Sequence, residues 1–132
     1  MIVVDTSALI AIVKNEIGAF DCQEVLTGES KVLLNAATLT EALIVARGKK
    51  CLVGLSNLID RLPVTIVELD AVRAERAAAA YALFGKGFHP ASLNFGDCFA
   101  YATAKEFNCP LLYVGEDFAK TDVVSAIASP PA

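Results

Sequence analysis

The sequence predicts an α/β protein with a parallel sheet, and two observations support this prediction. Its short apolar runs are continuous rather than alternating, which is typical of strands that are buried on both faces. Longer segments with helical character separate these runs, and this succession implies parallel strands joined by right-handed crossovers. The strand-like runs are residues 2–4, 32–34, 64–67 and 111–114, with a last short strand expected at Val123 and Val124.

Helix-length segments fill the intervals between the strand-like runs. Asp70 and Gly85 stand at the two ends of one of them, where a capping residue and a helix stop belong. The segments are 7–13, 16–27, 37–61, 70–84 and 95–107, and we expect the third to be two helices with a break near residues 49–52. We expect residues 129–132 to form a tail.

Length and hydropathy indicate one domain without a membrane span. The 132 residues suit a single hydrophobic core, so we expect one domain over residues 1–132. The mean hydropathy of +0.54 is high, yet no apolar stretch reaches the roughly 18–20 residues of a membrane helix. We also expect no signal peptide, because a basic leader and a cleavage site are missing. These features predict a cytoplasmic protein.

The cysteines do not form a recognisable metal or redox motif. Four cysteines without a C-x-x-C pair, together with a single histidine, give little support to a zinc site. Most of them fall in apolar segments, where cysteine behaves as a small hydrophobic residue. We therefore expect buried free thiols in a reducing cytosol. They are Cys22, Cys51, Cys98 and Cys109.

The charge balance limits how this protein can bind nucleic acid. The net charge is −4, whereas proteins that bind nucleic acid through their overall field are basic. Any nucleic-acid activity must therefore come from a local site. The densest basic cluster is Arg47, Lys49 and Lys50, and both a solvated helix end and a phosphate contact remain open for it.

Acidic residues gather at positions where the chain should turn at one edge of the sheet. Asp5 and Asp117 follow strand-like runs, and ligands of open α/β sheets bind beyond the carboxyl ends of the strands. Glu41 and Asp97 fall near helix starts. Each acid also has a structural explanation. Asp5 could cap a helix, and Asp117 could begin a helical turn. The patterns Thr38-x-x-Glu41 and Asn94-x-x-Asp97 predict capping boxes.

Together these acids predict a metal site. Several carboxylates that converge on one point cannot all stay ionised without a cation. Oxygen ligands of this kind suit Mg²⁺ or Mn²⁺. Such an ion activates water and stabilises the charge that develops on a phosphate, which is the chemistry of phosphodiester hydrolysis.

Four segments of the chain carry recognisable motifs. The most specific is Asn-Phe-Gly-Asp-Cys-Phe-Ala-Tyr-Ala within residues 93–102, and the Asp-Thr-Ser opening within residues 2–9 is moderately specific. Thr-Glu-Ala at residues 40–42 and the segment 111–118 complete the pattern. In their order and spacing these motifs resemble the PIN domains of VapC-type toxins from bacterial toxin–antitoxin pairs, and the resemblance covers essentially the whole chain.

This resemblance implies a three-layer α/β/α sandwich around a parallel sheet of about five strands. It also implies endoribonuclease activity that depends on Mg²⁺ or Mn²⁺, a homodimer, and inhibition by a cognate antitoxin. Asp5 and Asp97 would be the principal metal ligands, and Glu41 would complete the site directly or through water. Many PIN domains place the fourth acid in a Thr-x-Asp pattern, but residues 113–115 read Tyr-Val-Gly. Asp117 is therefore our candidate.

Two other acids and several polar residues are secondary candidates. Glu116 is the fallback for the fourth acid, and Asp122 is a more distant third choice. Thr6 and Ser7 could bind a metal water or a phosphate, or cap the first helix. Asn94 could orient Asp97 as well as cap its own helix. His89, the sole histidine, is expected to be an exposed loop residue.

Two other functions compete with the nuclease. An aspartate-based phosphohydrolase usually needs a second aspartate two residues after the first, and here that position is Ser7. A catalytically silent binding module with the same fold would be indicated by an eroded site, yet Asp5, Glu41 and Asp97 are all present.

Overall fold

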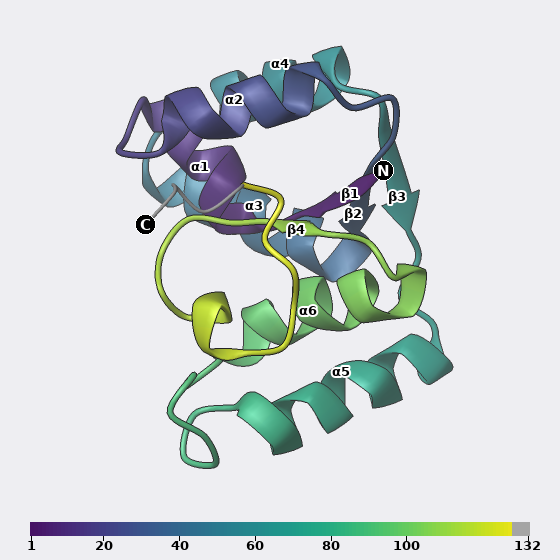
Figure 1. Ribbon diagram of the computed structural model, residues 1–132. Helices are drawn as coiled ribbons and strands as arrows, with labels where there is room; N and C mark the ends of the chain where they lie inside the picture. Colours follow the sequence, from purple (N-terminus) through teal and green to yellow (C-terminus); the bar gives the residue numbers. More distant parts are fainter. Residues whose placement is uncertain (128–132) are drawn as a thin grey trace.

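The computed structural model describes residues 1–127 and contains a parallel sheet in the order β3-β2-β1-β4 (Figure 1). In register, Val3 of β1 lies between Leu33 of β2 and Leu111 of β4. All of the pairings are parallel, which confirms the prediction from the continuous apolar runs. The strands are β1 (Ile2–Val4), β2 (Val32–Asn35), β3 (Val64–Val67) and β4 (Leu111–Leu112).

Helices cover both faces of the sheet, so that the molecule has the three layers of an α/β/α sandwich. Figure 1 shows α1, α2 and α4 on one face and α5 and α6 on the other. The expected break within residues 37–61 is present, since α3 and α4 are separate helices. The helices are α1 (Thr6–Lys14), α2 (Ala19–Thr27), α3 (Ala36–Gly48), α4 (Leu52–Arg61), α5 (Ala71–Phe84) and α6 (Phe95–Phe107), followed by the short 3₁₀ helix η1 (Phe118–Lys120).

Alternate residues of the central strands belong to two separate cores. Val4 and Leu34 pack into the core formed with α1 to α4. Val3 and Leu33 pack into the core formed with α5 and α6. Successive side chains of a strand point to opposite faces. Each fully buried Val or Leu side chain stabilises the folded state by about 1.5–3 kcal/mol. This packing explains why the strand sequences are continuously apolar.

The edge strand β3 departs from the expected burial. Ile66 is 45% exposed, although neighbouring Val67 is buried. β3 pairs only with β2 and lies at the end of the sheet, so fewer elements cover it. The expectation that every strand is buried on both faces is therefore wrong for β3.

The sheet has four strands in the described residues, so the expectation of about five was too high. Val123 and Val124 do not form a strand. Leu111 donates its N–H to the carbonyl of Val124 at 2.8 Å and accepts from the N–H of Ala126 at 2.9 Å. These bonds make one isolated bridge between Leu111 and Ser125. Because β4 has only two residues and bonds this segment only through Leu111, no longer ladder forms.

The structure also bears on the expected caps of the helix at residues 70–84, on the cysteines, on membrane helices and on the tail at the end of the chain. Asp70 caps α5 through the N–H of Arg73, and Gly85 ends that helix. All four cysteines are free thiols, of which Cys22 and Cys98 are buried. No helix among residues 1–127 has the length and apolar character to cross a membrane. The expected tail at residues 129–132 lies outside the described residues.

Candidate active site

Asp5 lies directly after β1 and is both a helix cap and a buried acid. One carboxylate oxygen, Oδ2, accepts hydrogen bonds from the backbone N–H of Ser7 at 3.0 Å and from its hydroxyl at 2.7 Å. The other oxygen, Oδ1, is buried and has no hydrogen-bond partner within residues 1–127. Only 3% of the residue is exposed. A buried oxygen without a partner is costly, so this end of Asp5 is available to a cation.

Ser7 holds the carboxyl ends of two neighbouring strands together. Its hydroxyl donates to Asp5 and accepts from the N–H of Val114 at 3.0 Å. Val114 follows β4, which pairs with β1. The Ser7 hydroxyl is therefore occupied within the protein, and its role is to orient Asp5.

Glu41 does not form the capping box that its spacing from Thr38 predicts. The capping box Thr38-x-x-Glu41 is wrong, because the N-cap of α3 is Asn35, three residues before Thr38, and its side chain accepts from the N–H of Ala37 at 2.8 Å. Glu41 thus lies within the helix, and its Oε1 accepts a hydrogen bond from the Thr6 hydroxyl at 2.6 Å. This contact turns the acid toward the start of α1, next to Asp5.

Gly96 gives the Glu41 carboxylate the space that it occupies. A Cβ atom at position 96 would collide with Oε2 of Glu41. The carboxylate therefore lies against the first turn of α6, one residue before Asp97. This role of Gly96 was not predicted from the sequence, where the only signal for it is a glycine inside the first turn of a helix.

The capping box predicted for Asn94 and Asp97 is confirmed. The Asn94 side chain accepts from the N–H of Asp97 at 2.9 Å, and Asp97 Oδ2 accepts from the N–H of Asn94 at 3.0 Å. Asp97 is only 8% exposed. The cap fixes the orientation of the side chain, and one carboxylate oxygen takes no part in it. Capping and site formation therefore coexist in Asp97.

Burial and the negative charges of neighbouring acids make Asp5 and Asp97 reluctant to ionise. Desolvation raises the pKa of Asp5 to about 6, although the hydrogen bonds from Ser7 act to lower that pKa. Desolvation also raises the pKa of Asp97 to about 7, and the negative charges of Asp5, Asp117 and Glu41 raise it further. The fold thus brings the four predicted acids into electrostatic contact. A bound cation would remove this penalty.

Among the candidates for the fourth acid, Asp117 is the one whose charge acts on Asp97. Asp117 lies just before η1 and is exposed. Asp122, by contrast, accepts a hydrogen bond from Tyr101 at 2.5 Å and pairs with Lys105 at 3.2 Å. Its carboxylate is therefore occupied on the side of α6.

The donor set fits a divalent cation of the Mg²⁺ type. It consists of carboxylate oxygens, one of which is buried without a partner. In residues 1–127, no three Asp, Glu, His or Cys side chains are already grouped as a complete ligand set. Mg²⁺ normally keeps several waters and uses one or two carboxylates. The arrangement therefore suits a sparsely ligated, hydrated ion.

The remaining secondary candidates have local structural roles. His89 is half-buried rather than exposed, since its Nδ1 accepts from the N–H of Ala91 at 3.0 Å and its ring meets the edge of Phe84. Arg47 and Lys49 are exposed, and Lys49 lies 3.8 Å from Glu16. The basic cluster is thus exposed on the surface, and a phosphate contact by it stays a prediction.

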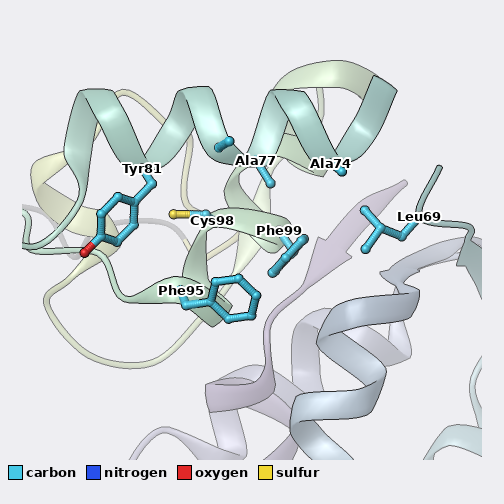
Figure 2. Close-up of a pocket in the computed structure, with 8 residues that line it drawn as sticks. Leu69, Ala74, Ala77, Tyr81, Phe95, Cys98 and Phe99 are labelled. Atoms are coloured by element: carbon cyan, nitrogen blue, oxygen red, sulfur yellow. The ribbon is translucent and has the colours of Figure 1, made fainter. Parts of the chain in front are cut away.

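An apolar groove adjoins the acidic site and was not foreseen from the sequence. Figure 2 shows Tyr81, Cys98, Phe99 and Leu69 along this groove of about 630 Å³, with Phe95 at its side. A second groove across Phe95 also includes Glu41. Phe95 is 77% exposed. The surface next to the acids is therefore apolar and aromatic, in keeping with the low positive charge of the chain.

Comparison with known proteins identifies the family. The family model described as the PIN domain matches residues 2–124. Ribonuclease VapC30 of Mycobacterium tuberculosis is 37% identical over 126 residues, which cover 93% of this chain and 96% of that protein. The chain therefore belongs to the PIN-domain family, and VapC ribonucleases are among the relatives that it matches.

Solved structures agree with the observed fold. VapC20 of Mycobacterium tuberculosis, described as a sarcin–ricin loop cleaving toxin, has a TM-score of 0.77 at 15% identity and covers 94% of this chain and 97% of its own. A toxin–antitoxin complex from Klebsiella pneumoniae contains a chain with a TM-score of 0.70 at 19% identity, covering 96% and 98%. At these identities the likeness shows the fold alone.

Proposed function

We propose that this protein is a metal-dependent endoribonuclease that hydrolyses RNA phosphodiester bonds and acts as the toxin of a toxin–antitoxin pair. The observation that carries the proposal is the pair of buried acids Asp5 and Asp97, whose raised pKa values and unpartnered oxygen favour a cation between them. The VapC ribonucleases among its relatives support the choice of RNA as substrate.

The acids divide into ligands and supporting groups. Asp5 and Asp97 hold Mg²⁺ or Mn²⁺, and Glu41 completes the site directly or through water. Asp117 is the fourth acid, supported by its charge acting on Asp97. When bound, the ion activates water and stabilises the charge that develops on the phosphate.

Neighbouring polar groups keep these acids in place during the reaction. Ser7 donates to Asp5, Thr6 donates to Glu41, and the backbone of Asn94 donates to Asp97. Each bond fixes one carboxylate oxygen and leaves the other free. Such preorganisation matters because small displacements of catalytic groups lower rates by orders of magnitude.

The same proposal includes partners and cellular setting. A cognate antitoxin neutralises the enzyme, as the toxin–antitoxin complex among its structural neighbours supports. We further propose a homodimer of one PIN domain per chain over residues 1–132. A cytoplasmic location is supported by the four free thiols.

A nuclease assay with matched variants tests the activity. Purified protein is incubated with RNA and Mg²⁺ or Mn²⁺ beside Asp5→Asn, Asp97→Asn and, as control, Asp60→Asn, which changes an exposed acid on α4. We expect cleavage by the wild type and the control, and its loss in the other two variants. Equal cleavage by all four proteins would indicate contamination and overturn the proposal.

Metal titration separates the nuclease from a silent binding module. Isothermal calorimetry with Mn²⁺ should give heat of binding for the wild type and for Asp60→Asn, and none for Asp97→Asn. A wild type that binds neither Mg²⁺ nor Mn²⁺ would favour the silent module. An aspartate-based phosphohydrolase remains disfavoured, because Ser7 occupies the position of its second aspartate and is bonded to Asp5.

A further inference from the structure

The face of α6 that carries Asp97 continues along two further polar residues. Asp97, Tyr101 and Lys105 are four residues apart, and this spacing places them on one face of a helix. The chain segment after β4, residues 113–125, runs beside this face (Figure 1). The charge of Asp117 acts on Asp97 at one end, and Asp122 contacts Tyr101 and Lys105 further along.

Tyr101 makes a hydrogen-bonded side-chain tie between α6 and this segment. It is 5% exposed, and its ring packs edge-on against Phe84 at 5.4 Å. Its hydroxyl donates to Oδ1 of Asp122 at 2.5 Å. Because its ring is buried and its hydroxyl bonds to a carboxylate, the Tyr101 side chain is held in one orientation and anchors the segment. Lys105 adds a second, exposed contact to the other oxygen of Asp122.

A series of hydrogen bonds and contacts connects Asp122 with the residues on either side of Asp117. The Thr121 hydroxyl donates to the carbonyl of Phe118 at 2.7 Å and accepts from the N–H of Val123 at 3.3 Å. Phe118 is buried and packs against the ring of Tyr113. The N–H of Ala119 closes the turn on the carbonyl of Glu116, directly before Asp117. Residues 116–123 therefore form one bonded unit.

Among residues 1–127, Asp117 has no comparable anchor of its own. Its side chain makes no capping hydrogen bond to η1, and the residue is exposed. Gly115, two residues before it, adopts a φ of 104°, a conformation that suits glycine and leaves the turn without a side chain there. The position of Asp117 therefore depends on the rest of the segment.

We propose that Tyr101 and Asp122 are positioning residues that hold Asp117 beside Asp97. The inference rests on the proposed function, because it assigns Asp117 to the metal site. It also gives Asp122 a role other than that of a metal ligand. We therefore expect that breaking the hydrogen bond between Tyr101 and Asp122 weakens metal binding only when Asp117 is present.

A double-mutant cycle on Mn²⁺ affinity tests this prediction. Tyr101→Phe keeps the ring and removes the hydroxyl, and Asp122→Ala removes an exposed carboxylate. We expect each to weaken the Kd for Mn²⁺ in calorimetry by about 10-fold, the lower end of the range for residues that orient metal ligands. In the Asp117→Asn background, Tyr101→Phe should change the Kd less than twofold. A merely structural role would give the same factor in both backgrounds.

The matched control is Glu106→Gln, which weakens a partly buried ion pair with Arg73 and Arg76 on another face of α6. It should lower the stability while leaving the Kd for Mn²⁺ unchanged. A Kd equal to the wild type in both Tyr101→Phe and Asp122→Ala would overturn the inference while leaving the nuclease proposal intact. Absence of Mn²⁺ binding in the wild type would overturn both.

A metal-free measurement provides an independent readout. Hydrogen exchange at the amides of residues 118–121 should be at least tenfold faster in Tyr101→Phe than in the wild type, because the segment loses its anchor. Exchange in the Glu106→Gln control should match the wild type at these amides. Unchanged exchange in Tyr101→Phe and in Asp122→Ala would contradict the anchoring role.

Discussion

Replacing Asp97 with asparagine should stabilise the metal-free protein while abolishing its activity. Asp97 is buried at the start of α6, and its pKa is raised to about 7 by desolvation and by the charges of Asp5, Asp117 and Glu41. Asparagine removes the charge but keeps an oxygen that can accept from the N–H of Asn94, so that the helix cap survives. The variant therefore isolates the electrostatic cost of the site.

The magnitude follows from the pKa. A carboxyl group whose pKa rises from 3.8 to about 7 on folding costs about 4 kcal/mol of stability once it is ionised. The buried asparagine amide lacks a known partner and costs about 1–3 kcal/mol. We therefore expect the free energy of unfolding to increase by about 2 kcal/mol at pH 8. For a domain of this size, this corresponds to roughly 8 °C in Tm.

The pH dependence has a definite sign. Between pH 3.8 and about 7 the folded wild type binds more protons at Asp97 than the unfolded chain does. Its stability therefore falls as the pH rises through this window. Asp97→Asn lacks this titration, so the variant should be about 1–3 kcal/mol less stable than the wild type near pH 4. Its relative stability should increase up to about pH 7 and then remain constant.

Thermal unfolding followed by circular dichroism, with EDTA at pH 5 and pH 8, measures the effect. Asp60→Asn is the control and should match the wild type at both values. Added Mg²⁺ should raise the Tm of the wild type by mass action and leave that of Asp97→Asn unchanged. A variant less stable than the wild type at pH 8 in EDTA, or a difference independent of pH, would refute the electrostatic reasoning.

Three further substitutions probe the groups around the acids. Gly96→Ala should lower RNA cleavage at least tenfold by displacing the Glu41 carboxylate. Its Tm should stay level or rise, because alanine favours the helix by about 1 kcal/mol. Cleavage at the wild-type rate would contradict the displacement of Glu41. Thr6→Val should reduce RNA cleavage about tenfold, equivalent to about 1.4 kcal/mol, because the hydrogen bond to Glu41 is lost. Thr6→Ser should restore the cleavage. If Thr6→Ser fails to restore it, Thr6 has a packing role instead. Ser7→Ala should cost about 1–2 kcal/mol of stability, measured by urea unfolding, because Asp5 loses a donor; an unchanged midpoint would exclude that contribution.

Local patterns predicted the parts of this protein that neighbouring residues decide. The cap of α6 depends on residues three apart, and Asn94 and Asp97 form it as expected. The central strands were recognisable because both of their faces are buried, which demands continuous apolar sequence. The separation into α3 and α4 was also visible in the sequence.

Patterns failed where a distant part of the chain decides the outcome. Thr38-x-x-Glu41 has the form of a capping box, yet Asn35 at the end of β2 starts the helix earlier. Glu41 instead bonds to Thr6, which is 35 residues away along the chain. The expected last strand is reduced to one bridge because β4 bonds it only through Leu111.

The sequence by itself determined the fold class and the identity of the best acid candidates, Asp5 and Asp97, because strand burial, helix caps and motif spacing are encoded locally. Only the tertiary structure decided that Glu41 bonds to Thr6, that the charge of Asp117 acts on Asp97 and that Asp122 is occupied by Tyr101. The physical reason is that carboxylates interact through space over a few ångströms. Chain packing, rather than sequence spacing, sets those distances.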